Sequence, residues 1–140
     1  MSDPFNLQHF IAAQEPVFSQ VTAELRAGAK RSHWMWFVFP QIAGLGFSAM
    51  AQRCAIASLD EARAYLAHPI LGPRLRACVQ LVLDVSGRDA HAVFGSPDDV
   101  KFRSSLTLFA RAAPGEALFP DALVKYYGGA EDAATLTKLA

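Results

Sequence analysis

The sequence predicts an all-α fold, a single compact domain of seven to nine helices that spans residues 1–140. Three observations support this prediction. Helix caps and helix-breaking prolines or glycines recur along the whole chain, with apolar residues at helical spacing between them. No segment alternates polar and apolar residues, and no Asn-Gly or Asp-Gly hairpin turn occurs. The length of 140 residues is also close to the usual size of one domain.

Caps and breakers separate the helices expected in the N-terminal half. An Asp-Pro start precedes the first helix, and Pro16 restarts the pattern in a second helix that ends near Gly28. A serine is expected to cap each of the next three helices. The last of these has a capping box, because Glu61 follows Ser58 by three residues. The expected segments are 3–15, 16–28, 32–39, 48–56 and 58–67.

The C-terminal half has similar signals. A Gly-Pro pair at 72–73 opens a helix with one apolar stripe, and a Gly-Gly pair at 128–129 closes a later one. The run Ser96–Asp99 combines a cap, a proline and two acids, which favour a helix start because they face the positive end of the helix dipole. The expected segments are 72–83, 89–94, 96–113, 118–127 and 132–139.

Composition excludes several functional classes. Hydrophobic residues make up 52% of the chain and charged residues 19%, as in an ordered globule. Thirteen basic and thirteen acidic residues cancel, so we expect neither a nucleic-acid coat nor a membrane as partner. Cys54 and Cys78 lack the spacing of a metal or redox pair, and buried reduced thiols are expected, with no metal and no cofactor. Residues 1–5 lack the features of a signal peptide, and we expect a cytoplasmic monomer or homodimer.

The stretch from Lys30 to Ser48 concentrates aromatic and basic residues. It contains both tryptophans, Trp34 and Trp36, behind a cationic lead-in. A flat indole can stack a ring, and fixed positive charge can hold a phosphate. Residues two apart on a helix point about 200° away from each other, so the two indoles diverge. The alternative is a core helix, in which the rings pack inside and Arg31 lies in a solvated loop.

Candidate site residues fall into two groups. The catalytic candidates are His33, which can titrate near neutrality, Gln41, which can orient a sugar, and Asp99, a carboxylate that first-turn capping also explains. Glycines near a helix start let backbone amides approach a phosphate. The ligand-binding candidates are Lys30, Arg31, Trp34, Trp36, Gly44, Gly46, Ser48, Lys101 and Arg103.

The run Ser32–Gln41 (SHWMWFVFPQ), together with Gly44–Ser48 and Asp99–Ser105, resembles the bacterial family known as domain of unknown function 1810. The similarity covers nearly the whole chain, and the family has no established activity. Members are often labelled calpastatin, a disordered inhibitor, which this globular composition contradicts. The order of elements is loosely similar to the NADAR superfamily, helical domains associated with NAD, ADP-ribose and N-glycosidic bonds. Ser32 stands where that superfamily has a glutamate.

These residues and resemblances lead to a functional hypothesis. We expect the protein to bind a nucleotide or an ADP-ribose-like small molecule, with N-glycosidase-type chemistry in the enzymatic version. The alternative is a small protein-interaction module without catalytic activity, in which an exposed aromatic surface docks a partner. A concave pocket bounded by Arg31 and a tryptophan would favour the ligand. A flat apolar patch over buried indoles would favour the partner.

Overall fold

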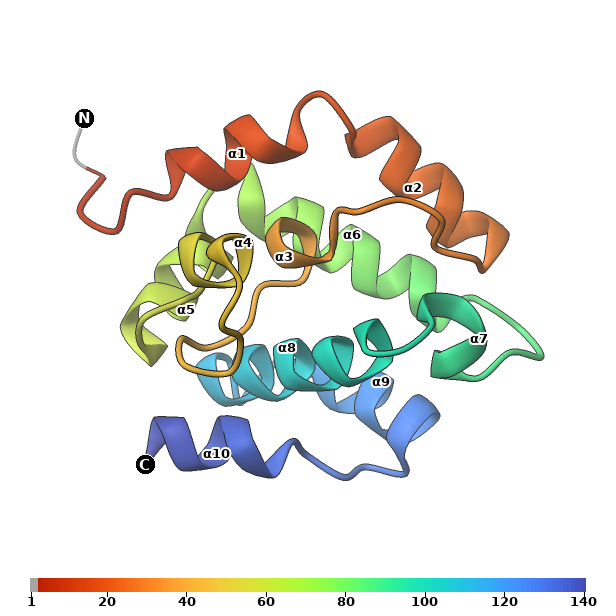
Figure 1. Cartoon of the computed structure of the whole chain (residues 1–140). Coiled ribbons are helices and arrows are strands. Elements are labelled where there is room, and N and C mark those ends of the chain that lie inside the picture. Colours follow the sequence, from red (N-terminus) through yellow and green to blue (C-terminus); the bar gives the residue numbers. More distant parts are fainter. Residues whose placement is uncertain (1–2) are drawn as a thin grey trace.

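A computed structural model describes residues 3–140 and confirms the all-α prediction (Figure 1). Met1 and Ser2, which belong to the segment expected to lack a signal peptide, lie outside the described residues. Residues 3–140 form ten helices, one above the predicted range of seven to nine, and each corresponds to one of the ten expected segments. The helices are α1 (Gln8–Gln14), α2 (Phe18–Ala27), α3 (Met35–Val38), α4 (Ala49–Arg53), α5 (Leu59–Ala67), α6 (Leu71–Leu83), α7 (Ala90–Phe94), α8 (Asp98–Ala112), α9 (Leu118–Tyr127) and α10 (Ala133–Leu139).

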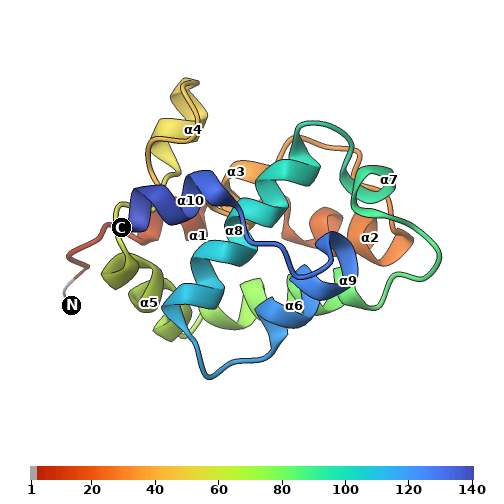
Figure 2. The ribbon, with the colours of Figure 1, turned by 90° about the horizontal axis from the view of Figure 1, so that it is seen from below.

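Helix α8 runs through the centre of the fold and packs against α5, α7, α9 and α10 (Figures 1 and 2). Phe102, Leu106 and Phe109 on this helix are buried in the core. Ser104 and Thr107 are buried as well, and each hydroxyl donates a hydrogen bond to the backbone carbonyl four residues earlier. A helix can be covered on most sides only if its buried polar groups are satisfied in this way.

Aromatic packing ties the short helix α3 to this centre. Phe39, just after α3, lies edge-on to Phe94 with ring centroids 5.9 Å apart and to Phe102 at 4.8 Å. Such edge-to-face pairs stabilise a core beyond the burial of their area. The contact fixes α3 against α7 and α8, and it thereby sets the direction of the tryptophans that precede Phe39.

Four predicted helix starts carry side-chain caps, of which the two serines were expected as caps and the two aspartates were expected only as helix starts. The side chains of Ser48, Ser58, Asp89 and Asp132 each accept a hydrogen bond from the backbone amide three residues later, at 2.8–3.2 Å. Glu61 completes the capping box, although its carboxylate accepts from the amide just before Ser58. These caps depend on neighbouring residues alone, which is why the sequence pattern identifies them.

Three predicted helix starts are wrong. Helix α1 begins at Gln8 and not directly after the Asp3-Pro4 pair. Helix α8 begins at Asp98 without a side-chain cap, so Ser96 does not have the expected role. Helix α3 begins at Met35 and does not use Ser32 as a cap, because the Ser32 hydroxyl donates to the carboxylate of Glu24 at 2.6 Å and accepts from the side chain of Gln20. Partners on α2 thus replace the local capping bond.

Residues 43–55, which we call the arm, leave the body of the fold and return to it (Figure 2). Ile42 and Ile56 pair in an isolated parallel bridge, and both are buried. The Ile56 amide donates to the carbonyl of Gln41, and the Ala43 amide donates to the carbonyl of Ile56, both at 2.8 Å. The arm is therefore an excursion held at its base, with α4 standing away from the other helices in Figure 2.

Two expectations from composition can be compared with this structure. Cys54 and Cys78 are free and buried, as predicted. Burial raises the pKa of both thiols, that of Cys78 to about 12, so that both stay protonated near neutrality. Within residues 3–140, no helix combines the length and the apolar character that crossing a bilayer requires.

Candidate functional site

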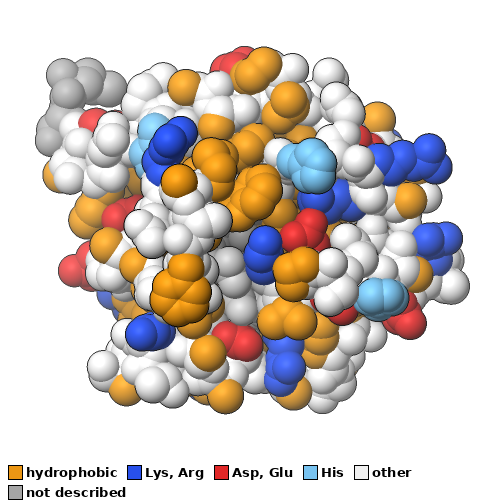
Figure 3. Space-filling model, in the orientation of Figure 1, with side chains coloured by type: hydrophobic (Ala, Val, Ile, Leu, Met, Phe, Trp, Pro, Cys, Tyr) orange, Lys and Arg blue, Asp and Glu red, His pale blue; other side chains and the backbone are white. Residues whose placement is uncertain are grey.

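A surface hollow of 390 Å³ lies between the arm, α3, α8 and the start of α10. Figure 3 shows the molecule in the orientation of Figure 1, with hydrophobic side chains gathered beside basic and acidic ones. The wall combines one indole, several apolar groups, small polar groups, one cation and one carboxylate. It is lined by Trp36, Gln41, Leu45, Gly46, Phe47, Ser48, Ala51, Pro97, Val100, Lys101, Ser104, Asp132 and Ala134.

Trp36 supplies the flat face of the hollow. It is half-buried, whereas its neighbours Met35 and Phe37 point into the core. Lys101 on the first turn of α8 places its Nζ 5.1 Å from the centroid of the indole and 3.5 Å from an oxygen of Asp98. The Lys101 side chain is 24% exposed. A molecule in the hollow can therefore contact a cation and an indole together.

Trp34 and Lys30 form a second pair with similar geometry, but it is closed to solvent. Trp34 is fully buried, and its indole N–H donates to Glu24 at 3.0 Å. The Nζ of Lys30 lies 5.0 Å from the Trp34 ring centroid and 2.8 Å from Asp98, and its side chain is only 7% exposed. The structure corrects the expectation that these two residues bind a ligand, because their polar groups are already paired within the protein. The Trp34 indole N–H is paired with Glu24 and the Lys30 ammonium group with Asp98.

Glu24 is the reason that this pair is closed. Its buried carboxylate accepts hydrogen bonds from the amides of Arg31 and Ser32, at 2.8 and 3.1 Å, besides those from the Ser32 hydroxyl and the Trp34 indole. Burial alone would raise the pKa of this carboxyl, but the hydrogen bonds bring it down to about 2. These hydrogen bonds hold the loop 29–34 around the carboxylate and keep the Trp34 side chain in the core.

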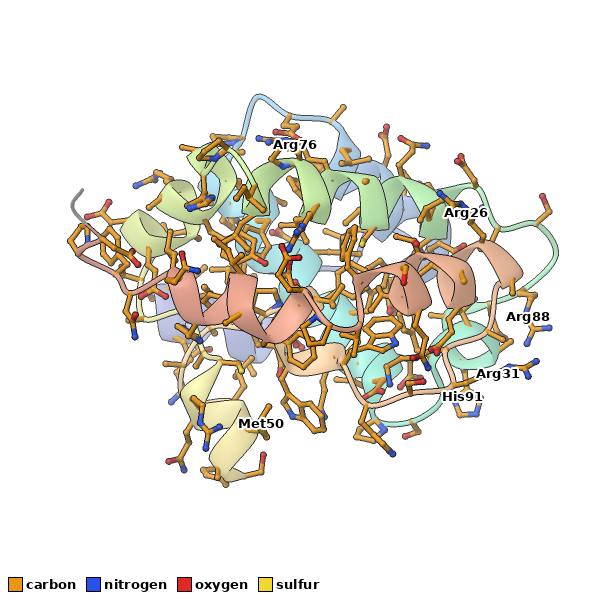
Figure 4. All side chains as sticks on the ribbon, turned by 90° about the horizontal axis from the view of Figure 1, so that it is seen from above. Arg26, Arg31, Met50, Arg76, Arg88 and His91 are labelled. Carbon is orange, nitrogen blue, oxygen red and sulfur yellow. The ribbon has the colours of Figure 1, made fainter. Side chains whose placement is uncertain are left out.

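Neither Arg31 nor His33 lines the hollow. Both side chains are exposed. Figure 4 shows Arg31 near Arg88 and His91 at the α7 end of the molecule, far from Met50 on the arm. The hollow is concave and bounded by a tryptophan, as the ligand hypothesis requires, but its cation is Lys101.

Two further candidates have structural partners outside the hollow. Arg103 donates to the carbonyls of Ala130 and Glu131 at 2.9 and 3.0 Å, and so it holds the turn between α9 and α10. Asp99 lies 3.5 Å from the Nδ1 of His91 and is not part of the wall. The structure therefore corrects both expected roles, because Arg103 already has acceptors and Asp99 faces α7.

Five predicted residues do come together in the hollow: Trp36, Gln41, Gly46, Ser48 and Lys101. Gly44 is close by on the arm but outside the wall, against the side chain of a lysine from α10. The side chain of Ser48 is engaged as the cap of α4.

The remaining eight wall residues were not among the candidates from the sequence: Leu45, Phe47, Ala51, Pro97, Val100, Ser104, Asp132 and Ala134. Asp132 has a clear signal only as a helix cap, and it serves as one, because its carboxylate accepts from the amide and hydroxyl of Thr135 at 2.9 and 2.6 Å. The sequence could have indicated Phe47, because a large aromatic residue in a glycine-rich loop is often left exposed. It is 86% exposed.

The wall is better suited to binding than to proton transfer. Of the three catalytic candidates only Gln41 lines it, and none of the described histidines does. Within residues 3–140, no cluster of three or more His, Cys, Asp or Glu side chains could hold a metal ion. The available chemistry is thus a flat ring face, an ammonium group, apolar surface, a few neutral hydrogen-bonding groups and the carboxylate of Asp132, which accepts two hydrogen bonds from Thr135.

The comparisons with known proteins agree with this fold. The chain matches a family model described as protein of unknown function (DUF1810) over residues 4–139. It is similar to the crystal structure at 1.38 Å of the conserved hypothetical protein Rv1873 from Mycobacterium tuberculosis, with 56% sequence identity, a TM-score of 0.97 and 98% of each chain covered. A comparison with curated proteins gave no match. The resemblance stated from the SHWMWFVFPQ motif is confirmed, and the chain belongs to the DUF1810 family.

Proposed function

We propose that the hollow binds a small, flat, anionic molecule of the nucleotide or ADP-ribose-like class. One observation carries this proposal: Lys101 and Trp36 meet on the wall, with 5.1 Å between the Nζ and the ring centroid. The volume of 390 Å³ falls in the lower part of the range of about 300–1,000 Å³ that small-molecule pockets occupy. The looser resemblance to NADAR domains points to the same ligand class and stays a prediction.

Lys101 is well placed to exchange its partner. Its contact with Asp98 is 3.5 Å long and only partly exposed, and even surface pairs of better geometry contribute only about 0–1 kcal/mol. Asp98 has a closer partner in Lys30, at 2.8 Å. A phosphate that enters the hollow can therefore take the Lys101 ammonium without leaving Asp98 unpaired.

The proposal is restricted to binding. N-glycosidase-type chemistry would need an acid or base beside the sugar, and His33 and Asp99 lie elsewhere. Gln41 and Asp132 are the wall residues that could approach a sugar. Asp132 is held by Thr135 as a helix cap, which fits a positioning role better than proton transfer.

The two tryptophans provide an internal control for the test. In a 15N-correlated NMR titration with AMP, NAD and ADP-ribose, the indole N–H signal of Trp36 should shift, whereas that of the sealed Trp34 should stay in place. The Lys101→Ala variant should lose the shift, and the Arg31→Ala variant should keep it. An unchanged Trp36 signal at millimolar concentrations of all three ligands would contradict the proposal.

A second candidate function, a protein-interaction module, is favoured by one observation. Phe47 and Val100 lie on the wall of the hollow and are 86% and 54% exposed, which is unusual for large apolar side chains. A second copy of the chain is the simplest partner for such a surface. Sedimentation at increasing concentration should then show self-association in the native protein and its loss in the Phe47→Ser variant.

A further inference from the structure

We infer that Phe47 is a ligand-binding residue carried by a hinged arm, and that the arm closes this ring over a molecule in the hollow. This inference rests on the proposed function for the identity of the ligand. It concerns a residue on the wall opposite the helices, and it depends on how residues 43–55 are attached to the fold.

The base of the arm is fixed. Ile42 and Ile56 are buried and pair in the isolated bridge. The two 2.8 Å backbone hydrogen bonds around them hold the first and last residues of the arm together. Movement of the arm therefore cannot spread into the core. A long segment attached at a fixed base can move as a hinged unit, because a few backbone angles near the base absorb the motion.

The arm is braced internally. The Ser48 hydroxyl accepts from the amide of Ala51 at 3.1 Å, and the side chain of Gln52 donates to the carbonyl of Phe47 at 3.0 Å. The second bond ties the backbone of Phe47 to α4. Phe47 and α4 consequently move together, as one unit.

The attachment of this unit to the body is weak. None of the residues of α4 is buried. Leu45 and Met50 are only partly buried against the core, and the one buried residue of the arm, Cys54, lies at its leaving end, two residues before Ile56. Segments with few buried apolar contacts open at low free-energy cost, and the lids of binding sites come from this class.

The pivot on the entering side is Gly44. Its backbone has a φ of +96°, in the left-handed region that a side chain would strain. The position of a Cβ there would also lie 3.0 Å from the side chain of Lys138 on α10. Both facts favour glycine at the one point where the arm turns away from its fixed base.

Phe47 gains most from closure. It already lies on the wall, but 86% of its surface is exposed, so its ring makes few contacts in the open arrangement. A flat ligand on the Trp36 side of the hollow would give that ring a stacking partner and remove it from water. Aromatic stacking on a base is worth enough that truncation to alanine weakens binding about tenfold.

The first experiment measures AMP binding to native protein, Phe47→Ala and Val124→Ala by NMR titration. Val124 is the matched control, because it is 64% exposed on α9 and is not part of the hollow. We expect about tenfold weaker binding for Phe47→Ala, no change for Val124→Ala and unchanged melting temperatures for both. Equal affinity of native protein and Phe47→Ala would overturn the inference while leaving the proposed function intact.

The second experiment needs no ligand. Relaxation-dispersion NMR should detect microsecond-to-millisecond exchange shared by the amides of residues 44–54, and none at Ile56. An arm as rigid as α8 would overturn the hinge. If the native protein binds no AMP, the proposed function and the role of Phe47 fail together, and the dispersion result alone then decides whether the arm moves.

Discussion

Two lysine–tryptophan pairs lie side by side in this protein, and only one of them is open. Lys30 covers Trp34 and Lys101 covers Trp36 at nearly the same distance, 5.0 and 5.1 Å, and Asp98 contacts both lysines. The same pairing of groups is a structural element in one case and a candidate site in the other. The difference is Glu24, which accepts a hydrogen bond from the indole of Trp34 and has no counterpart at Trp36 among residues 3–140.

The largest effect on the closed pair should come from removal of the Glu24 carboxylate. The Glu24→Gln variant should lose about 3 kcal/mol of unfolding free energy in urea titrations, because the negative charge is lost and one of the two acceptor oxygens becomes an NH2 group that faces other donors. Glu15→Gln is the control, since Glu15 is exposed and pairs only with Arg74. A loss below about 1 kcal/mol would mean that Glu24 does not hold the closed pair.

The same carboxylate predicts a pH dependence. Its pKa falls from 4.5 to about 2 in the folded state, so the stabilisation is complete above pH 4.5 and is lost as the pH drops toward 2. The native protein should therefore lose its stability advantage over Glu24→Gln across this acid window. The check is a set of urea titrations of both proteins at several pH values. A constant difference would show that Glu24 is not the titrating group.

Replacement of each indole by a phenyl ring tests the two pairs separately. Trp34→Phe should cost about 2 kcal/mol, because it strands one acceptor site of buried Glu24 and leaves a gap. Trp36→Phe removes a half-buried ring edge and should cost less than about 1 kcal/mol. Ligand binding should show the reverse order, with the larger loss in Trp36→Phe. Thermal melts and AMP titrations of both variants would settle the order, and equal stability losses would remove the distinction.

The link between the two pairs can be weakened at Asp98. Asp98→Asn should cost about 1–2 kcal/mol, because Lys30 is nearly enclosed and loses its carboxylate at 2.8 Å. Asp99→Asn, one residue on, is the control and should change stability by less, since Asp99 faces the exposed His91. Unfolding titrations of the two variants at neutral pH test this order. A larger loss in Asp99→Asn would contradict it.

The sequence predicts the helices better than the site, for a physical reason. The caps at Ser48 and Asp132 depend on amides three residues away, so a local pattern identifies them. Ser32 fails as a cap because Glu24, eight residues earlier, accepts from its hydroxyl. That contact exists only after α2 and the following loop have folded together, and no pattern within one helix contains it.

The residues of the site could likewise be predicted only in part from the sequence. The helical angle between Trp34 and Trp36 predicts that the indoles diverge, and they do. Which one faces out depends on where α3 begins, and Glu24 decides that. The cation of the hollow, Lys101, comes from a helix that lies more than sixty residues further along the chain. The nearby Arg31 was the more obvious candidate, but proximity in sequence does not place it in the hollow.

The smallest expected change in stability carries the most weight for function. Lys101→Met should change the unfolding free energy by about 0.5 kcal/mol or less, because its partner is 3.5 Å away and its side chain is partly exposed. Lys30→Met, the matched change in the closed pair, should cost more, since it removes a nearly enclosed ammonium group that lies 2.8 Å from Asp98. AMP binding should respond in the opposite sense, with a loss in Lys101→Met and little change in Lys30→Met. If both variants lose stability equally and neither affects binding, Trp36 and Lys101 form part of the scaffold, and the hollow has no role as a site.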